Sequence, residues 1–107
     1  KQKHIEAKTF EQLASEKFDL LINATSASLT NALPEMPKNI QLNQTFTYDM
    51  MYAKLPTLFM KFAKQHGAAR VSDGLGMLVE QAAESFFVWR GVRPETKSVL
   101  IRVRAAL

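Results

Sequence analysis

Val71–Phe87 reads VSDGLGMLVEQAAESFF, and this stretch decides the fold of the chain. It starts as a short loop with two glycines, Gly74 and Gly76, and continues as the clearest helix in the sequence. Gly91 stands where a glycine commonly ends such a helix. The apolar positions recur at the spacing of one buried helical face, namely Leu75, Leu78, Val79, Ala82, Ala83, Phe86 and then Trp89 or Arg90. A glycine loop that opens a helix lets a ligand approach the backbone, because no Cβ stands in the way.

The length and composition favour one domain or a piece of one. The chain has 107 residues, of which 47% are hydrophobic, and this supports an adequate but small core. It contains no cysteine, which excludes disulfides, thiolate metal sites and cysteine nucleophiles. No apolar run has the length of a membrane span, and the first residues lack a signal-peptide pattern. We therefore expect a cytoplasmic protein with no membrane contact.

The net charge is +4, and basic residues gather near the end of the chain. Two readings are open for this basic end, a nucleic-acid-binding tail and a solvated terminal helix. Interleaved aromatic residues and a docking motif are missing, so we favour the solvated helix and expect no nucleic-acid partner. His4 and His66 have no carboxylate at ligand spacing beside them, so no metal site is expected. The basic residues are Arg90, Arg93, Lys97, Arg102 and Arg104, against Glu95 alone.

Three short strands and four helices are expected along the chain. Thr9 and Gln12 have the spacing of a capping box, which predicts a helix over residues 9–17. Pro56 and Gly67 mark the expected start and end of a later helix. The strands are expected at residues 18–26, 45–52 and 68–72, the first of them buried on both faces. A turn-rich connection is expected at residues 27–44, and a last helix from about Pro94.

This order of elements is that of an α/β fold with a mostly parallel sheet. Each strand ends in polar residues, and in open parallel sheets ligands bind beyond the carboxyl ends of the strands. Asp49 and Asp73 stand at two of these ends, where we expect each to cap or pair rather than to catalyse. The glycine fingerprint G-x-G-x-x-G is absent from these residues. The pattern therefore predicts a partial Rossmann-like, doubly wound domain that is incomplete without an upstream half.

Four motifs follow one another along the chain: NATS over residues 23–26, YDMMY over 48–52, DGLGMLVEQA over 73–82, and FFVWRGVRP over 86–94. In this order they resemble the motifs of shikimate dehydrogenase. The resemblance covers nearly the whole chain from Phe18 onward, whereas the first 17 residues match only as a generic lead-in. Any one of the motifs is weak, but four in the right order and spacing make a specific match.

The resemblance implies an enzyme that reduces 3-dehydroshikimate to shikimate with NADPH. It implies that Met50 lines the nicotinamide pocket and that the Gly74 backbone contacts the nicotinamide end. Thr25 and Ser26 would lie along the cofactor near its adenosine side, and Met77 is assigned to the cofactor with them. The small-molecule substrate would contact the Tyr52 hydroxyl and the Gln81 amide.

The resemblance also implies what these 107 residues lack. The family's catalytic lysine and aspartate lie in an N-terminal substrate domain, and the glycine-rich phosphate loop and the arginine that reads the 2′-phosphate precede residue 1. Residues 1–107 would form the C-terminal half of the cofactor domain, with about 75–107 as terminal helices that pack toward the substrate domain. The chain alone is expected to be inactive and to self-associate through an exposed sheet edge.

Two departures from the family pattern carry their own expectations. Ser28 stands where the family usually has glycine, so strained or altered backbone angles are expected there. Leu58 stands where the family usually has proline, which shifts the expected start of that helix by a residue or two. Two other functions stay open: a non-catalytic interaction module built on the half-fold, and a quinate-accepting relative of the same family.

Overall fold

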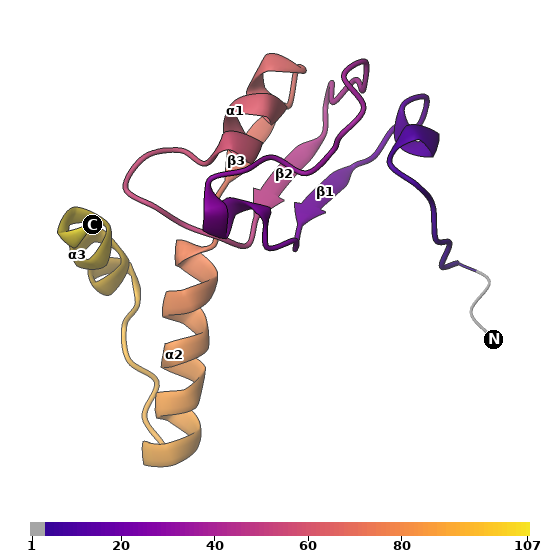
Figure 1. The fold of residues 1–107 in the computed structure, drawn as a ribbon. Helices are drawn as coiled ribbons and strands as arrows, with labels where there is room; N and C mark the ends of the chain where they lie inside the picture. Colours follow the sequence, from indigo (N-terminus) through magenta and orange to yellow (C-terminus); the bar gives the residue numbers. More distant parts are fainter. Residues whose placement is uncertain (1–3) are drawn as a thin grey trace.

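The computed structural model describes residues 4–107, a three-stranded sheet with helices around it (Figure 1). Two 3₁₀ turns, η1 and η2, lie in the first third of the chain. The α/β class predicted from the sequence is confirmed. In chain order the elements are η1 (Glu11–Leu13), β1 (Leu20–Asn23), η2 (Ala27–Thr30), β2 (Phe46–Asp49), α1 (Leu58–Gln65), β3 (Arg70–Ser72), α2 (Leu75–Arg90) and α3 (Lys97–Ala106).

The three strands are parallel and lie in the order β1-β2-β3. Asn23 pairs with Asp49, and Tyr48 with Ser72, so the carboxyl ends of all three strands meet at one edge. Parallel neighbours need a crossover connection. Residues 24–45 provide the first crossover, and α1 provides the second. The three predicted strands are confirmed, each shorter than its predicted range.

The core lies on the face of the sheet that α1 covers. Ile40 and Leu42, from the connection between β1 and β2, are almost fully buried there with Phe62 and Ala63 of α1. Leu21 of β1 and Val71 of β3 pack against this cluster. The connection predicted as turns therefore carries two of the most buried side chains of the chain.

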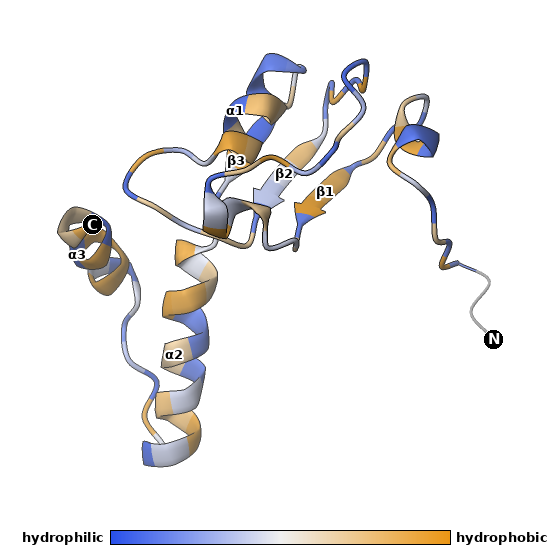
Figure 2. Cartoon of the chain, in the orientation of Figure 1, coloured by the Kyte–Doolittle hydropathy of each residue, from blue (hydrophilic) through white to orange (hydrophobic). Residues whose placement is uncertain are grey.

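The opposite face of the sheet is open among the described residues. Leu20 and Ile22 of β1 are 50% and 51% exposed, and β1 stands out as an apolar strand in Figure 2. The prediction of a first strand buried on both faces is thus wrong for this chain. Alternate side chains of a strand point to opposite faces, and α1 and the connection cover only the side of Leu21.

The ends of two helical segments differ from the predictions. Thr57 is the N-cap of α1, and its hydroxyl oxygen accepts from Met60 N. This helix therefore begins at Leu58, two residues after Pro56 and within the shift expected from the missing proline. At the N-terminus, Gln12 Oε1 accepts from Thr9 N at 2.8 Å as half of a capping box, but only one 3₁₀ turn follows. A short segment without a buried face does not offset the cost of helix nucleation.

In the view of Figure 1, α2 runs downward from the sheet edge, and α3 packs against it from the left. Gly91 ends α2 with φ +72°, as predicted. The predicted buried face of α2 is confirmed only at Leu75, Val79 and Ala83. The other predicted positions are exposed, among them Leu78 at 38%, Phe86 at 42% and Trp89 at 77%. α3 begins at Lys97, later than expected, after the Glu95 carboxylate accepts from Ser98 N. Among residues 4–107, no helix is long and apolar enough to cross a bilayer.

Candidate functional site

Asp49 organises the carboxyl edge of the sheet. Its side chain is fully buried, and Oδ2 accepts from Thr57 Oγ1 at 2.7 Å and from Ser28 Oγ at 2.9 Å. Oδ1 accepts from Met51 N at 3.0 Å and from Asn23 Nδ2 at 3.4 Å. Four donors from separate segments satisfy a buried carboxylate that would otherwise be costly. The prediction that Asp49 is a paired carboxylate is confirmed.

Asn23 extends this network into the loop after β1. Its Oδ1 accepts from Thr25 Oγ1 at 2.7 Å and from Thr25 N at 3.1 Å. Its main-chain oxygen accepts from Met50 N at 3.0 Å. Asn23 and Asp49 together fix the start of the loop that carries Thr25 and the start of the loop that carries Met50.

Ser28 contributes to the network where strain was expected. Among residues 4–107, Asn31 and Gln44 are the non-glycine residues with positive φ, so the expectation of a strained backbone at Ser28 is wrong. The residue lies in η2, which L-residues adopt freely. Its hydroxyl supplies Asp49 with a hydrogen bond that a glycine cannot make.

Gly74 packs directly on the main chain of Met50. A Cβ at Gly74 would lie 2.0 Å from Met50 O and 2.6 Å from Met50 C. Gly74 N also donates to Met51 O at 2.9 Å. The loop after β2 and the start of α2 therefore touch backbone to backbone, which only glycine permits here. At Gly76, by contrast, a Cβ would meet nothing within 4 Å.

Asp73 lies just before α2 and pairs with a distant arginine. The N-cap of α2 is Gly74, so the prediction that Asp73 is the N-cap is wrong by one residue. Asp73 Oδ1 nevertheless accepts from Leu75 N, in the first turn, at 3.2 Å. Both carboxylate oxygens also accept from the guanidinium of Arg104 at 2.7 Å. Burial alone would raise the pKa of the Asp73 carboxyl, but the Arg104 hydrogen bond and the Leu75 amide hold that pKa below its ordinary value of 3.8.

The site residues expected from the sequence lie along this edge to different degrees. Met50 and Gly74 are in direct contact, and the half-exposed Met77 follows in the first turn of α2. Thr25 is joined to the same edge through Asn23, and Ser26 is exposed beside it. Tyr52 is half-buried and Gln81 is exposed. The Tyr52 hydroxyl and the Gln81 amide form no hydrogen bond with the described residues. The structure therefore does not connect these two side chains to each other or to the network at the edge.

Sequence reasoning missed most of the polar side chains that hold the edge. Ser28 was expected to alter the backbone, Thr57 was given no role, and Arg104 was assigned to a solvated terminal helix. A signal for Thr57 existed, because threonine one residue before an apolar helical run is a frequent N-cap. No local signal links Arg104 to Asp73, which lies 31 residues earlier.

The fold defines the class of protein: part of a Rossmann-like domain, a fold in which ligands bind beyond the carboxyl ends of the strands. The family model described as shikimate 5'-dehydrogenase C-terminal domain matches residues 74–100. The chain is 58% identical over 98 residues to the shikimate dehydrogenase (NADP+) of Nitrosospira multiformis, a match that covers 92% of this chain and 36% of that protein.

Solved structures agree with this match. An Ael1 enzyme from Pseudomonas putida superposes with a TM-score of 0.79 at 48% identity, over 87% of this chain and 34% of that one. A shikimate dehydrogenase in complex with NADP+ superposes with a TM-score of 0.70 at 30% identity, over 82% and 31% of the two chains. The chain belongs to the shikimate dehydrogenase family, and it spans about a third of the length of the relatives it matches.

Proposed function

We propose that the chain supplies the C-terminal, cofactor-side third of an NADP-dependent shikimate dehydrogenase, which reduces 3-dehydroshikimate to shikimate in the cytoplasm. The observation that carries this proposal is the backbone contact between Gly74 and Met50 at the carboxyl ends of β2 and β3. It leaves an open, partly apolar edge where a doubly wound sheet binds its ligand.

The residues at this edge fit a nicotinamide cofactor. Met50 and Met77 are 39% and 44% exposed on either side of Gly74 in sequence, and their polarizable side chains suit contact with a flat ring. Thr25 and Ser26 offer hydroxyl groups on the neighbouring loop. The cofactor supplies a hydride when it is bound. The residues of this chain would bind and orient it, with Met50 and Gly74 at the nicotinamide end.

Substrate binding would use Tyr52 and Gln81. Neither the Tyr52 hydroxyl nor the Gln81 amide has a hydrogen-bond partner among the described residues, so both can bond to a substrate hydroxyl or carboxylate. No pair of groups in the described edge is arranged for proton transfer, since Asp49 and Asp73 already accept from several donors each. We therefore assign no catalytic residue to this chain, and we expect no activity from it alone.

Exposed apolar surfaces on β1 and α2 support the proposal that the chain is part of a larger domain. One face of β1 is half exposed, and its outer edge has no partner strand among residues 4–107. Apolar side chains on the second half of α2 are exposed as well, so residues 75–107 would pack toward a substrate domain. Without these partners, we expect the chain to self-associate through the β1 edge. A monomeric sedimentation profile with strong amide protection in β1 would contradict this expectation.

The function is tested with two proteins measured side by side. One is the 107-residue chain alone. The other is a chimera in which this chain replaces the matching third of the Nitrosospira multiformis enzyme. NADPH oxidation with 3-dehydroshikimate is expected from the chimera and not from the chain. A stably folded chimera without activity, or a chain active by itself, refutes the proposal.

The same assay addresses the alternatives. A quinate-accepting relative would oxidise quinate with NADP+ at a rate comparable to that with shikimate. A stand-alone interaction module would give a folded but inert chimera, and the cellular protein would have the mass of the chain itself. An intact mass of the cellular protein therefore separates the module from the enzyme.

A further inference from the structure

Arg104, in the last turn of α3, forms hydrogen bonds with residues of the candidate site that lie far from it in sequence. Its Nη1 donates to Asp73 Oδ2 and its Nη2 to Asp73 Oδ1, both at 2.7 Å. Nη1 also donates to Ala53 O at 3.3 Å. One guanidinium thus holds the segment after β2 and the segment after β3 together.

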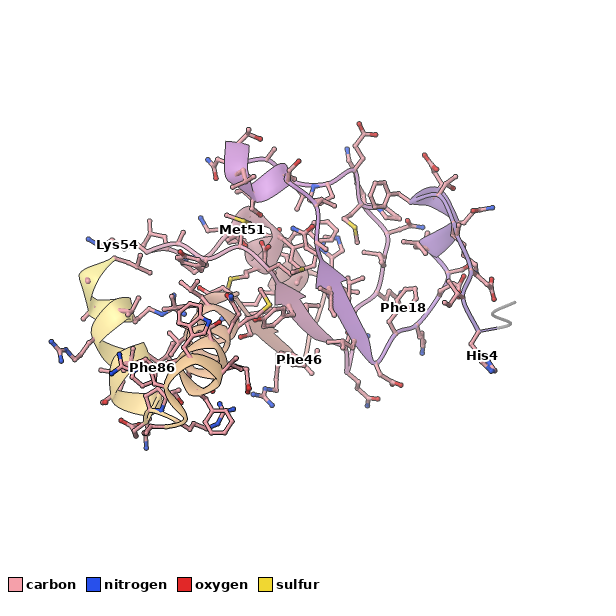
Figure 3. The ribbon with its side chains drawn as sticks, turned by 90° about the horizontal axis from the view of Figure 1, so that it is seen from below. His4, Phe18, Phe46, Met51, Lys54 and Phe86 are labelled. Carbon is pink, nitrogen blue, oxygen red and sulfur yellow. The ribbon has the colours of Figure 1, made fainter. Side chains whose placement is uncertain are left out.

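The Arg104–Asp73 ion pair is partly buried, and its geometry fixes the orientation of both side chains. The Asp73 side chain is only 8% exposed, whereas that of Arg104 is 44% exposed. A cavity of about 260 Å³ lies beside the pair, lined in part by Lys54 and Ser72. Figure 3 places Lys54 next to α3, and Figure 1 shows the loop after β2 reaching toward the same helix. A planar fork with two parallel hydrogen bonds fixes orientation as well as charge.

We propose that Arg104 is a positioning residue of the cofactor edge. It holds Ala53 and Asp73, whose chain neighbours Tyr52 and Gly74 are the proposed substrate and nicotinamide contacts. The proposal rests on the function proposed above for those two residues. Gly74 N donates to Met51 O, so a shift of Asp73 passes directly to the main chain beside Met50.

The role can be separated from the general attachment of α3. Thr96, just before α3, donates through Oγ1 to Glu80 Oε2 of α2 at 2.7 Å. Apolar side chains of both helices, among them Val79 and Val99, line a shared cavity of about 330 Å³. These contacts keep α3 beside α2 when Arg104 is replaced. Loss of the guanidinium therefore releases the edge without detaching the helix.

The kinetic test uses the active chimera with Arg104→Gln, Arg104→Lys and the control Arg102→Gln. Arg102 lies two residues away, is exposed, and forms no ion pair among residues 4–107. We expect Arg104→Gln to lower kcat roughly tenfold to a hundredfold, because small misplacements of reacting groups cost about that much. The KM values should change less. Arg104→Lys should recover part of kcat, since it keeps the charge and loses the fork. An unchanged kcat in Arg104→Gln, or the same fall in Arg102→Gln, overturns the proposal.

A second measurement does not depend on activity. Amide exchange in the 107-residue chain is followed at Gly74 and Leu75, whose N–H groups bond within the edge that Arg104 holds. Both amides should exchange faster in Arg104→Gln and at the wild-type rate in Arg102→Gln. Unchanged exchange at both positions overturns the positioning role. An inactive wild-type chimera would refute the proposed function alone, because this measurement still decides the role of Arg104.

Discussion

Replacement of Asp49 tests whether one buried carboxylate holds the candidate site together. In Asp49→Leu the apolar side chain accepts no hydrogen bond, so the buried Asn23 amide and Thr57 hydroxyl lose an acceptor, as does Met51 N. Each buried donor without a partner costs about 1–3 kcal/mol, so with three such donors the free energy of unfolding should fall by roughly 3–9 kcal/mol. That is a large share of the roughly 5–15 kcal/mol typical of a domain.

Asp49→Asn should be far milder, for a geometric reason. Its amide oxygen can take the place of Oδ1 and accept from Met51 N and Asn23. Its NH₂ group then faces Ser28 and Thr57, whose hydroxyl oxygens can accept. The network keeps its pairings but loses the charge and turns two hydroxyl groups, at a cost of about 1–3 kcal/mol.

Urea unfolding of the chain, followed by far-ultraviolet circular dichroism, measures both variants. The exposed Asp19 provides the control, and Asp19→Asn should stay within about 0.5 kcal/mol of wild type. The reasoning about Asp49 fails if the asparagine variant is as unstable as the leucine variant, or if the leucine variant is as stable as wild type.

Three further predictions concern the same edge. Gly74→Ala should destabilise the chain by about 1–3 kcal/mol, because the added Cβ overlaps the Met50 main chain. Gly76→Ala should stabilise it by about 0.5–1 kcal/mol, because alanine loses less backbone entropy than glycine in a helix and its Cβ meets no neighbour. The urea midpoints of the two variants must move in opposite directions. Ser28→Gly removes one hydrogen bond to a carboxylate, and thermal unfolding should report a loss of roughly 1.5–3 kcal/mol. The pKa of Asp73 is lowered in the folded chain, so its charge stabilises the fold above the ordinary pKa, and that stability is lost as the pH falls through the folded pKa. The difference in urea midpoint between wild type and Asp73→Asn should therefore be largest at neutral pH and vanish in strong acid. A difference that grows on acidification would contradict the lowered pKa.

The order of elements could be predicted from the sequence because local signals agree with the fold. Apolar runs of strand length stop at polar residues, and Gly67 and Gly91 end the helices before them with positive φ. The exception is the connection between β1 and β2. Ile40 and Leu42 alternate with polar residues among prolines and asparagines, a pattern that predicts turns, yet both side chains fill the core.

Burial was the part of the fold that the sequence could not settle. A strand such as β1 is apolar on both faces whether or not a partner covers the second face, so Leu20 and Ile22 look like core in the sequence and are half exposed in the structure. The same holds for Phe86 and Trp89 on α2. Periodicity identifies which side chains require a partner, but it does not identify whether that partner lies in the same 107 residues.

The candidate site was predictable where residue type alone restricts the chemistry, and not where long-range pairing does. Gly74 is required because two main chains meet, and the sequence indicates such a contact by the glycine itself. Arg104 and Asp73 are an arginine in a basic tail and an aspartate before a helix, and each has a sufficient local explanation. Their pairing joins α3 to both site loops, so the end of the chain that was interpreted as a solvated surface also fixes the geometry of the proposed cofactor edge. A charge count over residues 90–107 therefore describes the electrostatics of this segment, whereas the role of Arg104 depends on which single acceptor the fold brings to it.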